Sequence, residues 1–399
     1  MTIAVLGGGA AGMMAALAAA ETPGVHVVLL ERQARLGRKL AATGNGRCNL
    51  TNLSGLEGRY HGDAAFARKA LSAFAPEETL RYFRLMGLLT VTEPGGRVYP
   101  LSDQAASVVD VLRLGLESAG VEVRCGVHVD AVKREKGGFL LKWQEGTLFA
   151  GRLIVACGGA AGAKLGGGKW GYDLLETFGH KTTTLQPSLV QLKTAGTLGR
   201  SLKGIRADAG VEIRRGNERV AKNAGEVQFT EYGLSGPAVF EISRGAKPGM
   251  EVSLDLFREY SRGEVCALLS ARVKALGEMT VAEIFAGMLH GRLGRVVAKS
   301  VGIGESVPLS GLRDRDISRL AAAAKDFRFE ITGNMGFDGA QVTAGGIRTR
   351  DFDPVSLESR LVPGLFACGE VLDVDGDCGG YNLQWAWSSG RAAGLSAAR

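Results

Sequence analysis

The sequence lacks the patterns that mark disulfide-rich, metal-binding and membrane proteins. Its six cysteines include no CxxC pair, which excludes a zinc ribbon and a thioredoxin-like redox pair. Its five histidines form no ligand spacing such as HxxxH, so we expect no metal site. No apolar run approaches the ~18 residues that a membrane-spanning helix needs, and the first residues show no basic region typical of a signal peptide. We therefore expect a reduced, cytoplasmic protein with no membrane contact.

Proline is scarce, whereas glycine is abundant. The chain has 10 prolines and 59 glycines in 399 residues, and the glycines follow no three-residue period, which excludes a collagen. Apolar residues make up 45% and charged residues 22%, as in ordinary globular proteins, which excludes a disordered chain. The length predicts about two to three domains. Such a glycine content is typical of proteins whose backbone closely approaches phosphate groups.

The first thirty residues predict a dinucleotide site. An apolar strand is followed by the motif G-x-G-x-x-G, formed by Gly7, Gly9 and Gly12, and then by an alanine-rich helix. The glycines allow a tight turn, the approach of a pyrophosphate and close packing of helix on strand, while the helix N-terminus attracts the phosphates. A second apolar run ends at Glu31, 19 residues after Gly12, where an acid binds ribose hydroxyls.

The same glycine spacing recurs once, at Gly166, Gly168 and Gly171. It follows its strand only after a long glycine-rich stretch, and no second strand with a terminal acid comes after it. We interpret this match as accidental and expect a single dinucleotide site.

Two further segments indicate that the dinucleotide is FAD. Residues 32–52 gather cations around the turn Thr43–Gly46, and cations with backbone N–H groups form an anion-binding concavity, which an extended FAD needs and a nicotinamide cofactor does not. Residues 364–394 indicate a strand, a loop and a helix, whose first amides at Gly380–Leu383 suit the pyrimidine end of a flavin. The cations of the first segment are Arg32, Arg35, Arg38, Lys39 and Arg47.

Six segments carry a resemblance to a known family. They are GRKLAATGNGRCNLTN, RVYPLSDQAASVVDVL, GYDLLETFGH, GLSGPAVFEIS, VTAGGI and CGEVLDVDGDCGGYNLQWAWSSG. Together they resemble a bacterial family of flavoproteins described as NAD(P)/FAD-dependent oxidoreductases or as the aminoacetone oxidase family, one branch of which is a flavin reductase of bile-acid dehydroxylation. The matches run in one order from residue 3 to residue 394, nearly the whole chain.

The resemblance implies an α/β fold: a glutathione-reductase-like, FAD-binding Rossmann domain built from both chain ends, with an inserted small β-barrel that carries a helical subdomain. We place the FAD-binding domain at residues 1–188 and 341–399, the barrel at 189–256 and 326–340, and the helical subdomain at 257–325. Two positions depart from the family pattern. Glu231 stands where a histidine usually precedes GLSGP, and Ala160–Ala163 replaces a Ser-x-Pro.

Motifs and resemblance together predict the residues that hold FAD. The first turn would bind the pyrophosphate, Glu31 the adenosine ribose, residues 39–49 the middle of the cofactor, and residues 369–383 the ribityl chain and ring. Val129 is expected to contact adenine through its backbone. The full set is Gly7, Gly9, Ala10, Ala11, Gly12, Glu31, Arg32, Lys39, Thr43, Gly44, Gly46, Arg47, Cys48, Asn49, Val129, Ala156, Gly158, Gly369, Glu370, Asp377, Gly380, Tyr381, Asn382 and Leu383.

The sequence leaves the catalytic group open among three candidates. Cys48, like Cys378, is either a redox thiol or a small side chain packed against the flavin, and packing is favoured because the cysteine pair of a disulfide reductase is absent. Tyr381 either donates a proton or lies near the ring. His180 either performs acid–base chemistry or caps the helix that precedes it.

We expect hydride transfer through flavin N5, fed by NAD(P)H docking transiently, to an activated C=C bond of a small molecule such as a keto-steroid. One alternative is a flavin-containing RNA-binding or tRNA-modifying protein. It would use the cations Arg200, Lys203, Arg206, Arg214, Arg215, Arg219 and Lys222, which otherwise form a solvated barrel face. The other is a flavin amine oxidase, which uses O2. The oligomeric state is left open.

Overall fold

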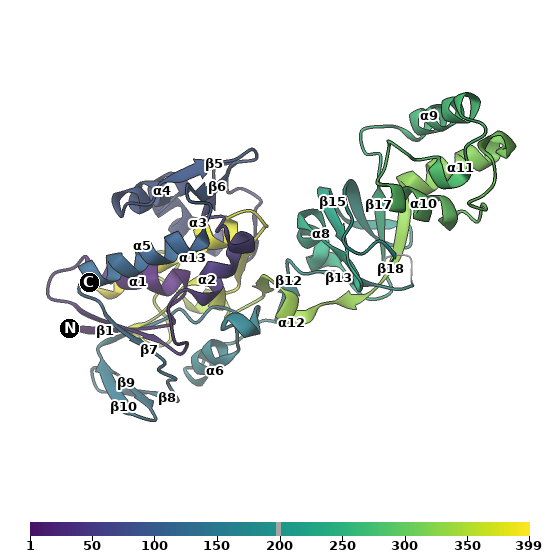
Figure 1. Cartoon of the computed structure of the whole chain (residues 1–399). Coiled ribbons are helices and arrows are strands. Elements are labelled where there is room, and N and C mark those ends of the chain that lie inside the picture. Colours follow the sequence, from purple (N-terminus) through teal and green to yellow (C-terminus); the bar gives the residue numbers. More distant parts are fainter. Residues whose placement is uncertain (197–200) are drawn as a thin grey trace. The chain divides into compact units, whose positions relative to one another are not determined.

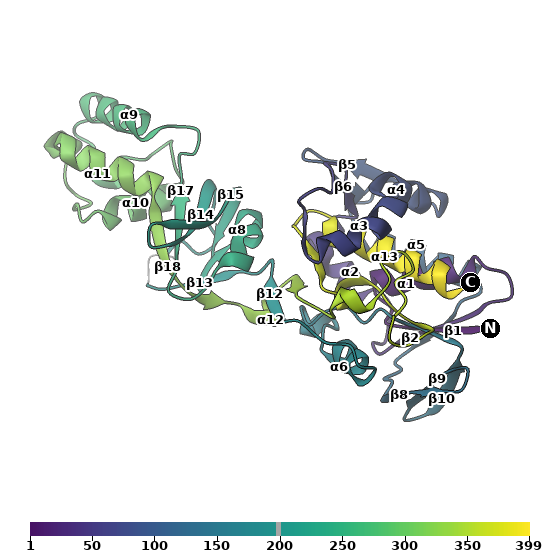
Figure 2. The same ribbon diagram turned by 180° about the vertical axis from the view of Figure 1, so that it is seen from behind.

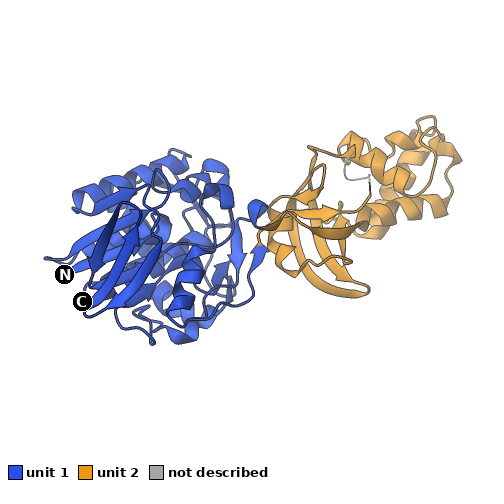
Figure 3. Ribbon diagram, turned by 90° about the horizontal axis from the view of Figure 1, so that it is seen from below, with its two compact units in different colours: residues 1–187, 337–399 blue, residues 188–336 orange. Residues whose placement is uncertain are grey.

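The computed structural model describes residues 1–196 and 201–399. Residue contacts divide the chain into two compact units, one formed by residues 1–187 and 337–399 and the other by residues 188–336 (Figure 3). The first unit is therefore assembled from both chain segments that flank the second. The sequence analysis placed these boundaries at residues 188 and 341. The predicted α/β fold, a Rossmann-type domain with an inserted barrel, is confirmed.

The first unit is built on a parallel sheet of five strands in the order β20-β11-β1-β2-β7. These strands are β1 (Thr2–Leu6), β2 (His26–Glu31), β7 (Glu122–Cys125), β11 (Arg152–Val155) and β20 (Leu365–Ala367). Helices α1 (Ala10–Ala20), α5 (Ala105–Ser118) and α13 (Tyr381–Ala397) cover one face. The strands β8 (Ala131–Glu135), β9 (Gly138–Trp143) and β10 (Gly146–Ala150) lie on the other (Figures 1 and 2). Because both faces are covered, β1 and β2 are continuous apolar runs.

Helices α1 and α13 pack with their backbones nearly in contact. A Cβ added to Gly390 would lie 2.4 Å from the carbonyl oxygen of Ala11, and one added to Gly394 would lie 2.2 Å from that of Ala15. The alanines of α1 supply the other half of this close approach. The last helix of the chain is thereby fixed against the helix that starts at the first glycine turn.

The first unit contains further elements from residues 38–104 and from the later part of the chain. The earlier elements are α2 (Arg38–Ala42), η1 (Thr43–Gly46), β3 (Thr51–Asn52), β4 (Tyr60–Gly62), α3 (Ala64–Ala73), α4 (Pro76–Leu85), β5 (Thr90–Thr92) and β6 (Arg97–Pro100). The later elements are α6 (Trp170–Thr177), β12 (Gln186–Ser188), α12 (Gly336–Gly339), β19 (Val342–Ala344), η7 (Gly369–Val371) and β21 (Val374–Gly376). Strand β4 pairs antiparallel with β21, so segments more than 300 residues apart lie side by side.

The second unit is a closed barrel of six strands in the order β13-β16-β15-β14-β17-β18. The strands are β13 (Leu192–Thr194), β14 (Arg206–Arg215), β15 (Glu218–Phe229), β16 (Gly233–Ser235), β17 (Glu251–Asp255) and β18 (Phe327–Asn334), with α8 (Pro237–Ile242) after β16. Helices α9 (Arg262–Ala275), α10 (Gly291–Ser300) and α11 (Asp314–Lys325) lie between β17 and β18 in the chain. Barrel and helices share one apolar core. Strand β15 escaped the sequence analysis because its twelve residues mix polar and apolar side chains and only two of them, Val227 and Phe229, are fully buried.

Candidate dinucleotide site

The turn between β1 and α1 holds three glycines that are needed for different reasons. Gly7 has a φ of +106°, and a Cβ there would lie 2.5 Å from the carbonyl oxygen of Ala156. A Cβ on Gly12 would lie 1.8 Å from the carbonyl oxygen of Gly7, so the protein's own packing requires both glycines. A Cβ on Gly9 would meet no atom of the described residues within 4 Å. The space before Gly9, at the N-terminus of α1, is thus open to a group from outside the protein.

Glu31, at the end of β2, lies against the same turn. Its Oε2 accepts a hydrogen bond from the N–H of Gly8 at 2.6 Å, and its Oε1 accepts one from the N–H of Gln33 at 2.7 Å. A carboxylate has room for about four hydrogen bonds, so both oxygens retain a lone pair for a hydroxyl group. The two backbone bonds therefore hold an acceptor in place where the sequence analysis expected a ribose.

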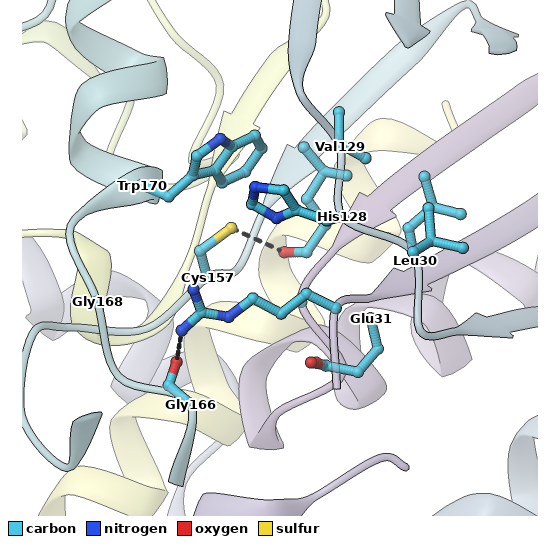
Figure 4. A pocket seen from close by; sticks show the side chains of 13 residues that line it. Leu30, Glu31, His128, Val129, Cys157, Gly166, Gly168 and Trp170 are labelled. Carbon is cyan, nitrogen blue, oxygen red and sulfur yellow. Dashed lines mark hydrogen bonds between the residues drawn. The ribbon is translucent and has the colours of Figure 1, made fainter. Parts of the chain in front are cut away.

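A recess opens beside Glu31 (Figure 4). Val129, expected to contact adenine, lines it together with His128 and Trp170, whose rings lie 6.4 Å apart. Arg32 reaches across and donates hydrogen bonds to the carbonyl oxygens of Gly166 and Gly167. The recess is thus bounded by an acid, a guanidinium and two rings, a suitable lining for a nucleoside.

The glycine motif that the sequence analysis set aside forms one wall of this recess. Gly166, Gly168 and Gly171 lead into α6 and line the same space as Gly7. They belong to the first site rather than to a second one. His128 and Trp170 were missed because no local pattern distinguishes them. Only the fold brings their rings to the recess.

The loop after α2 continues the site with an unusual backbone. Asn45 and Cys48 have φ angles of 56° and 61°, which non-glycine residues rarely adopt, and Gly44 and Gly46 also have positive φ. Strained backbone of this kind persists where the surrounding structure imposes it, and it often lies at functional sites. The side chain of Thr43 donates to the carbonyl oxygen of Leu40 at 2.7 Å and so stabilises the start of the loop.

Lys39 of α2 and Arg47 of this loop are both already paired with carboxylates. The Lys39 ammonium lies 2.7 Å from Oε2 of Glu370, whose Oε1 accepts a hydrogen bond from the N–H of Thr343 at 2.7 Å. Arg47 bridges Glu93 and Asp103 and lies 4.1 Å above the ring of Tyr99. Lys39 and Glu370, both expected to bind FAD, thus lie together. The charge of Arg47 is balanced by the carboxylates of Glu93 and Asp103.

Asn49 carries a buried side-chain oxygen, Oδ1, that has no hydrogen-bond partner among the described residues. A buried acceptor without a partner costs about 1–3 kcal/mol, so it marks a place where a donor from a ligand would be favourable. Two residues that follow Asn49 in the chain form hydrogen bonds with residues near the C-terminus. The side chain of Asn52 donates to the carbonyl oxygen of Gly379 at 2.8 Å, and Thr51 bonds Gln384 of α13 at 2.6 Å.

The start of α13 is uncapped. Gly380 precedes the helix with a φ of 104°, and no side chain of the described residues caps the first turn. Asn382 is fixed through its side chain, which bonds the N–H and the carbonyl oxygen of Gly376 at 2.8 and 2.7 Å. The first amides of α13, including Leu383, therefore present a partial positive charge toward the loop. The predicted residues of both chain ends converge here.

Three further predicted residues complete this frame. Ala156 follows β11, and its carbonyl oxygen packs so close to Gly7 that a Cβ added there would lie 2.5 Å away. Gly158 has a φ of +70° and no atom of the described residues within 4 Å of an added Cβ. Gly369, with a φ of +76°, packs on Ala11 of α1.

Asp377, a predicted site residue, lies beside α13 in a group of polar side chains whose other members, His61, Arg59 and Tyr60, were not predicted. The Nε2 of His61 lies 2.8 Å from Oδ1 of Asp377, and the Arg59 guanidinium lies 3.3 Å from Oδ2 of the same carboxylate. The hydroxyl of Tyr60 donates to the carbonyl oxygen of Tyr381 at 3.0 Å, and the two rings meet edge to face. No motif signals these contacts, because they arise from the pairing of β4 with β21.

All three catalytic candidates are buried in the protein interior. Burial raises the pKa of the Cys48 thiol to about 12, so it is protonated at neutral pH and packs as an apolar side chain. His180 is buried, stacks on Phe352 at 4.4 Å and lies 3.0 Å from the hydroxyl of Ser359. Burial lowers the pKa of His180, which keeps it neutral. Tyr381 is buried too, but lies at the start of α13.

The cations of the barrel are largely paired with carboxylates. Lys203 lies 2.5 Å from Glu231, the residue that departs from the family pattern. Further pairs join Arg206 to Glu226, Arg214 and Arg219 to Glu212, and Arg215 to Glu218. Arg200 lies outside the described residues. The expected basic cluster is therefore a mixed-charge surface over the part that the structure describes.

No helix within the described residues is long and apolar enough to cross a membrane. No group of three or more His, Cys, Asp or Glu side chains in residues 1–196 and 201–399 is arranged to hold a metal ion.

Comparison with known proteins gives consistent matches over the whole chain. A family model described as the HI0933-like protein Rossmann domain matches residues 1–396. The chain is 40% identical to the 3-dehydro-bile acid delta(4,6)-reductase of Clostridium scindens, over 99% of this chain and 98% of the relative. It is 32% identical to the ribosomal RNA dihydrouridine synthase of Escherichia coli, over 96% and 95%. A solved 3-ketosteroid delta1-dehydrogenase of Sterolibacterium denitrificans aligns over 100% of this chain and 99% of its own, with 16% identity and a TM-score of 0.48.

Proposed function

The chain belongs to the HI0933-like Rossmann-domain family and is an FAD-dependent oxidoreductase, and we propose that it reduces a C=C bond conjugated to a carbonyl group in a small molecule. The names of both relatives describe two hydrogens added across such a bond, in a 3-oxo bile acid and in uridine. The observation that carries the proposal is the 40% identity to the bile-acid reductase over 99% of the chain.

The described residues fit FAD at the adenosine end. We assign the pyrophosphate to the open space before Gly9 and to the first amides of α1, from Ala10 to Gly12. The ribose hydroxyls would bond the carboxylate of Glu31, which the N–H groups of Gly8 and Gln33 already orient. The adenine would enter the recess lined by Val129 and Trp170.

The described residues also fit FAD at the ring end. The partnerless Oδ1 of Asn49 is an acceptor for a donor of the cofactor, and the amides at the start of α13 suit an acceptor. When reduced, bound FAD supplies a hydride. The protein's part is to hold the acceptor's double bond near the ring and to exclude water from it. We propose NADPH or NADH as the electron source.

A small molecule is favoured over RNA by the electrostatics of the barrel. Nucleic-acid binding draws most of its free energy from cations that replace counterions on phosphates. In the second unit the described cations from Lys203 to Arg219 lie within 4.0 Å of a carboxylate, so their charges are already balanced within the protein. The pairing of these cations therefore favours a hydride acceptor that makes no phosphate contacts with the barrel.

Anaerobic visible spectroscopy of the purified protein tests the proposal. We expect a flavin band that NADPH or NADH bleaches and that a 3-oxo steroid with a conjugated double bond restores. The same reduced sample is mixed separately with a uridine-containing ribosomal RNA fragment and with air.

Each outcome has a distinct meaning. Recolouring by RNA alone would replace the proposed acceptor with uridine. Bleaching by an amine without NAD(P)H, followed by recolouring only in air, would make the protein an amine oxidase. A colourless protein that takes up no added FAD would overturn the cofactor.

A further inference from the structure

Reduction of a C=C bond needs a hydride at one carbon and a proton at the other, and none of the roles assigned above supplies the proton. We propose that His61, held by Asp377 and flanked by Arg59, is the proton donor of this reaction. The inference rests on the proposed function, because it requires an acceptor at the ring end of the site. Its subject is a side chain that neither the motifs nor the comparisons assign.

The geometry of the pair is set by backbone pairing. His61 and Asp375 are direct partners in the antiparallel pairing of β4 with β21, and Asp377 follows that strand. The N–H of Asp377 donates to the carbonyl oxygen of Arg59 at 2.9 Å, which brings the two segments into register. The Nε2 of His61 then lies 2.8 Å from Oδ1 of Asp377. The imidazole is therefore oriented by the sheet rather than by a mobile loop.

The carboxylate of Asp377 lies between a guanidinium and an imidazole. Arg59 occupies its Oδ2 at 3.3 Å, and His61 occupies its Oδ1 at 2.8 Å. Two other acids lie close by. Asp375 is buried opposite His61, and a Cβ on Gly62 would lie 2.5 Å from Oδ1 of Asp373.

The pair lies where the reaction would occur. Asp377 is three residues before Gly380, which starts α13, and the side chain of Asn382 donates to the carbonyl oxygen of Asp377 at 3.2 Å. These are the residues assigned to the ring end of FAD. The side chain of His61 is 40% exposed, against 17% for Asp377, so the imidazole is the more accessible of the two groups to an acceptor molecule.

The other four histidines and Tyr60 are engaged or remote. The hydroxyl of Tyr60 donates to the carbonyl oxygen of Tyr381. His180 is buried beside Ser359. His26 pairs with Glu122 at the first residue of β2, whereas the site lies at the other end of that strand, at Glu31. His128 lines the adenosine recess, and His290 caps α10 in the second unit. His61 is thus the histidine of the described residues that adjoins the start of α13.

The step balances with water as the final proton source. The hydride pair forms a new C–H bond at the carbon remote from the carbonyl group, while the π pair of the double bond takes a proton at the adjacent carbon. That proton leaves Nδ1 of the protonated imidazole, whose Nε2–H continues to donate to Asp377. The neutral imidazole then takes a proton from water. The acceptor gains two electrons, which reduced FAD loses.

The test separates the two halves of the catalytic cycle in the FAD-loaded protein. His61→Gln is compared with His26→Gln, a control that removes another histidine paired with a carboxylate, 3.1 Å from Glu122. We expect bleaching by NADPH to proceed at the wild-type rate in both variants. Recolouring by the conjugated ketone should slow by about 100- to 10,000-fold in His61→Gln, the range for loss of a general acid, and stay unchanged in His26→Gln.

A readout independent of activity follows the imidazole itself. The holoprotein is treated with diethyl pyrocarbonate, with and without the saturated ketone product, and carbethoxylated histidines are mapped by mass spectrometry. We expect the product to protect His61 and to leave His26 unprotected. FAD affinity and circular dichroism should match the wild type in His61→Gln, which excludes misfolding as the cause of a slow step.

The outcomes distinguish this inference from the function on which it rests. Recolouring of His61→Gln within about threefold of wild type, or modification of His61 that the product does not alter, would overturn the proton donor and leave the reductase intact. A wild-type protein that NADPH bleaches but no conjugated ketone recolours would overturn the proposed function and the donor together.

Discussion

At the scale of single residues, the described structure separates side chains that the fold needs from those that the cofactor needs. Gly7 and Gly12 are required by contacts inside the protein, whereas Gly9 is not. Asn49 has a buried oxygen that no described residue satisfies. A residue whose type is not required by packing or hydrogen bonding within the described structure is the best candidate for a contact with a ligand.

Replacing Glu31 with Gln should weaken FAD binding without unfolding the protein. The neutral amide keeps the size of the side chain, but its single oxygen cannot accept from both Gly8 and Gln33 and still serve a ribose hydroxyl. Loss of a charge-assisted hydrogen bond costs about 1.5–3 kcal/mol, so we expect FAD to bind about 10- to 100-fold more weakly by fluorescence titration. Glu117→Gln, on an exposed pair with Arg113, is the control. Equal affinities in the two variants would contradict the assignment.

Cys48 should resist alkylation in the folded protein. Burial raises the pKa of its thiol to about 12, so almost none is thiolate at pH 8, and the sulfur is inaccessible. Cys125 is exposed and should react first with iodoacetamide, as followed by mass spectrometry of peptides. If Cys48 were labelled as fast as Cys125, the redox interpretation of this cysteine would return.

At the scale of elements, the sequence pattern predicted those parts of the site whose residues are close together in the chain. The strand, glycine turn, helix and acid from β1 to Glu31 are contiguous, so their chemistry is visible in the pattern. The contact of His61 with Asp377 depends on strands whose residues are 316 positions apart, and no pattern within either segment encodes it. The place of Gly166 and Gly168 in the wall of the first recess was missed for the same reason: the loop closes a site whose other residues lie elsewhere in the chain.

The contact between α1 and α13 should tolerate no added methyl group. An alanine at Gly394 would place its Cβ 2.2 Å from the carbonyl oxygen of Ala15, so the helices must separate. Overpacking of this kind costs about 1–3 kcal/mol, and we expect a lower urea midpoint together with weaker FAD binding, since both helices start at the site. Gly291→Ala, where an added Cβ meets no described atom within 4 Å, is the control and should leave the midpoint unchanged. A wild-type midpoint in Gly394→Ala would show that the helices can separate without loss.

At the scale of the whole molecule, the charge of +7 is not evenly divided between the units. Residues 188–336 hold 22 Lys and Arg against 17 Asp and Glu, so most of the excess lies in the inserted unit. The described cations there are interleaved with carboxylates rather than gathered on one bare face. The composition alone suggested a nucleic-acid surface, and the pairing of individual side chains argues against it.

Binding to RNA should accordingly be weak and insensitive to the barrel cations. We expect Arg206→Glu and Arg219→Glu to leave the affinity for a ribosomal RNA fragment unchanged within about twofold, measured by fluorescence anisotropy at several salt concentrations. A protein that uses several phosphate contacts loses affinity steeply with salt, by a slope near the number of contacts. A steep slope that these reversals reduce would favour the RNA-modifying alternative.

The assembly of the first unit from two separated segments has a consequence for how the protein acquires its cofactor during synthesis. When residues 1–187 have left the ribosome, the outer edge of β11 lacks β20, and α1 lacks α13. The glycine turn and Glu31 are present by then, but the residues that close the ring end emerge only after the whole inserted unit has been translated. A nascent chain interrupted within the barrel therefore carries the proposed adenosine end of the site and Asn49 but lacks the start of α13. We expect tight retention of FAD only from chains that have been extended through α13.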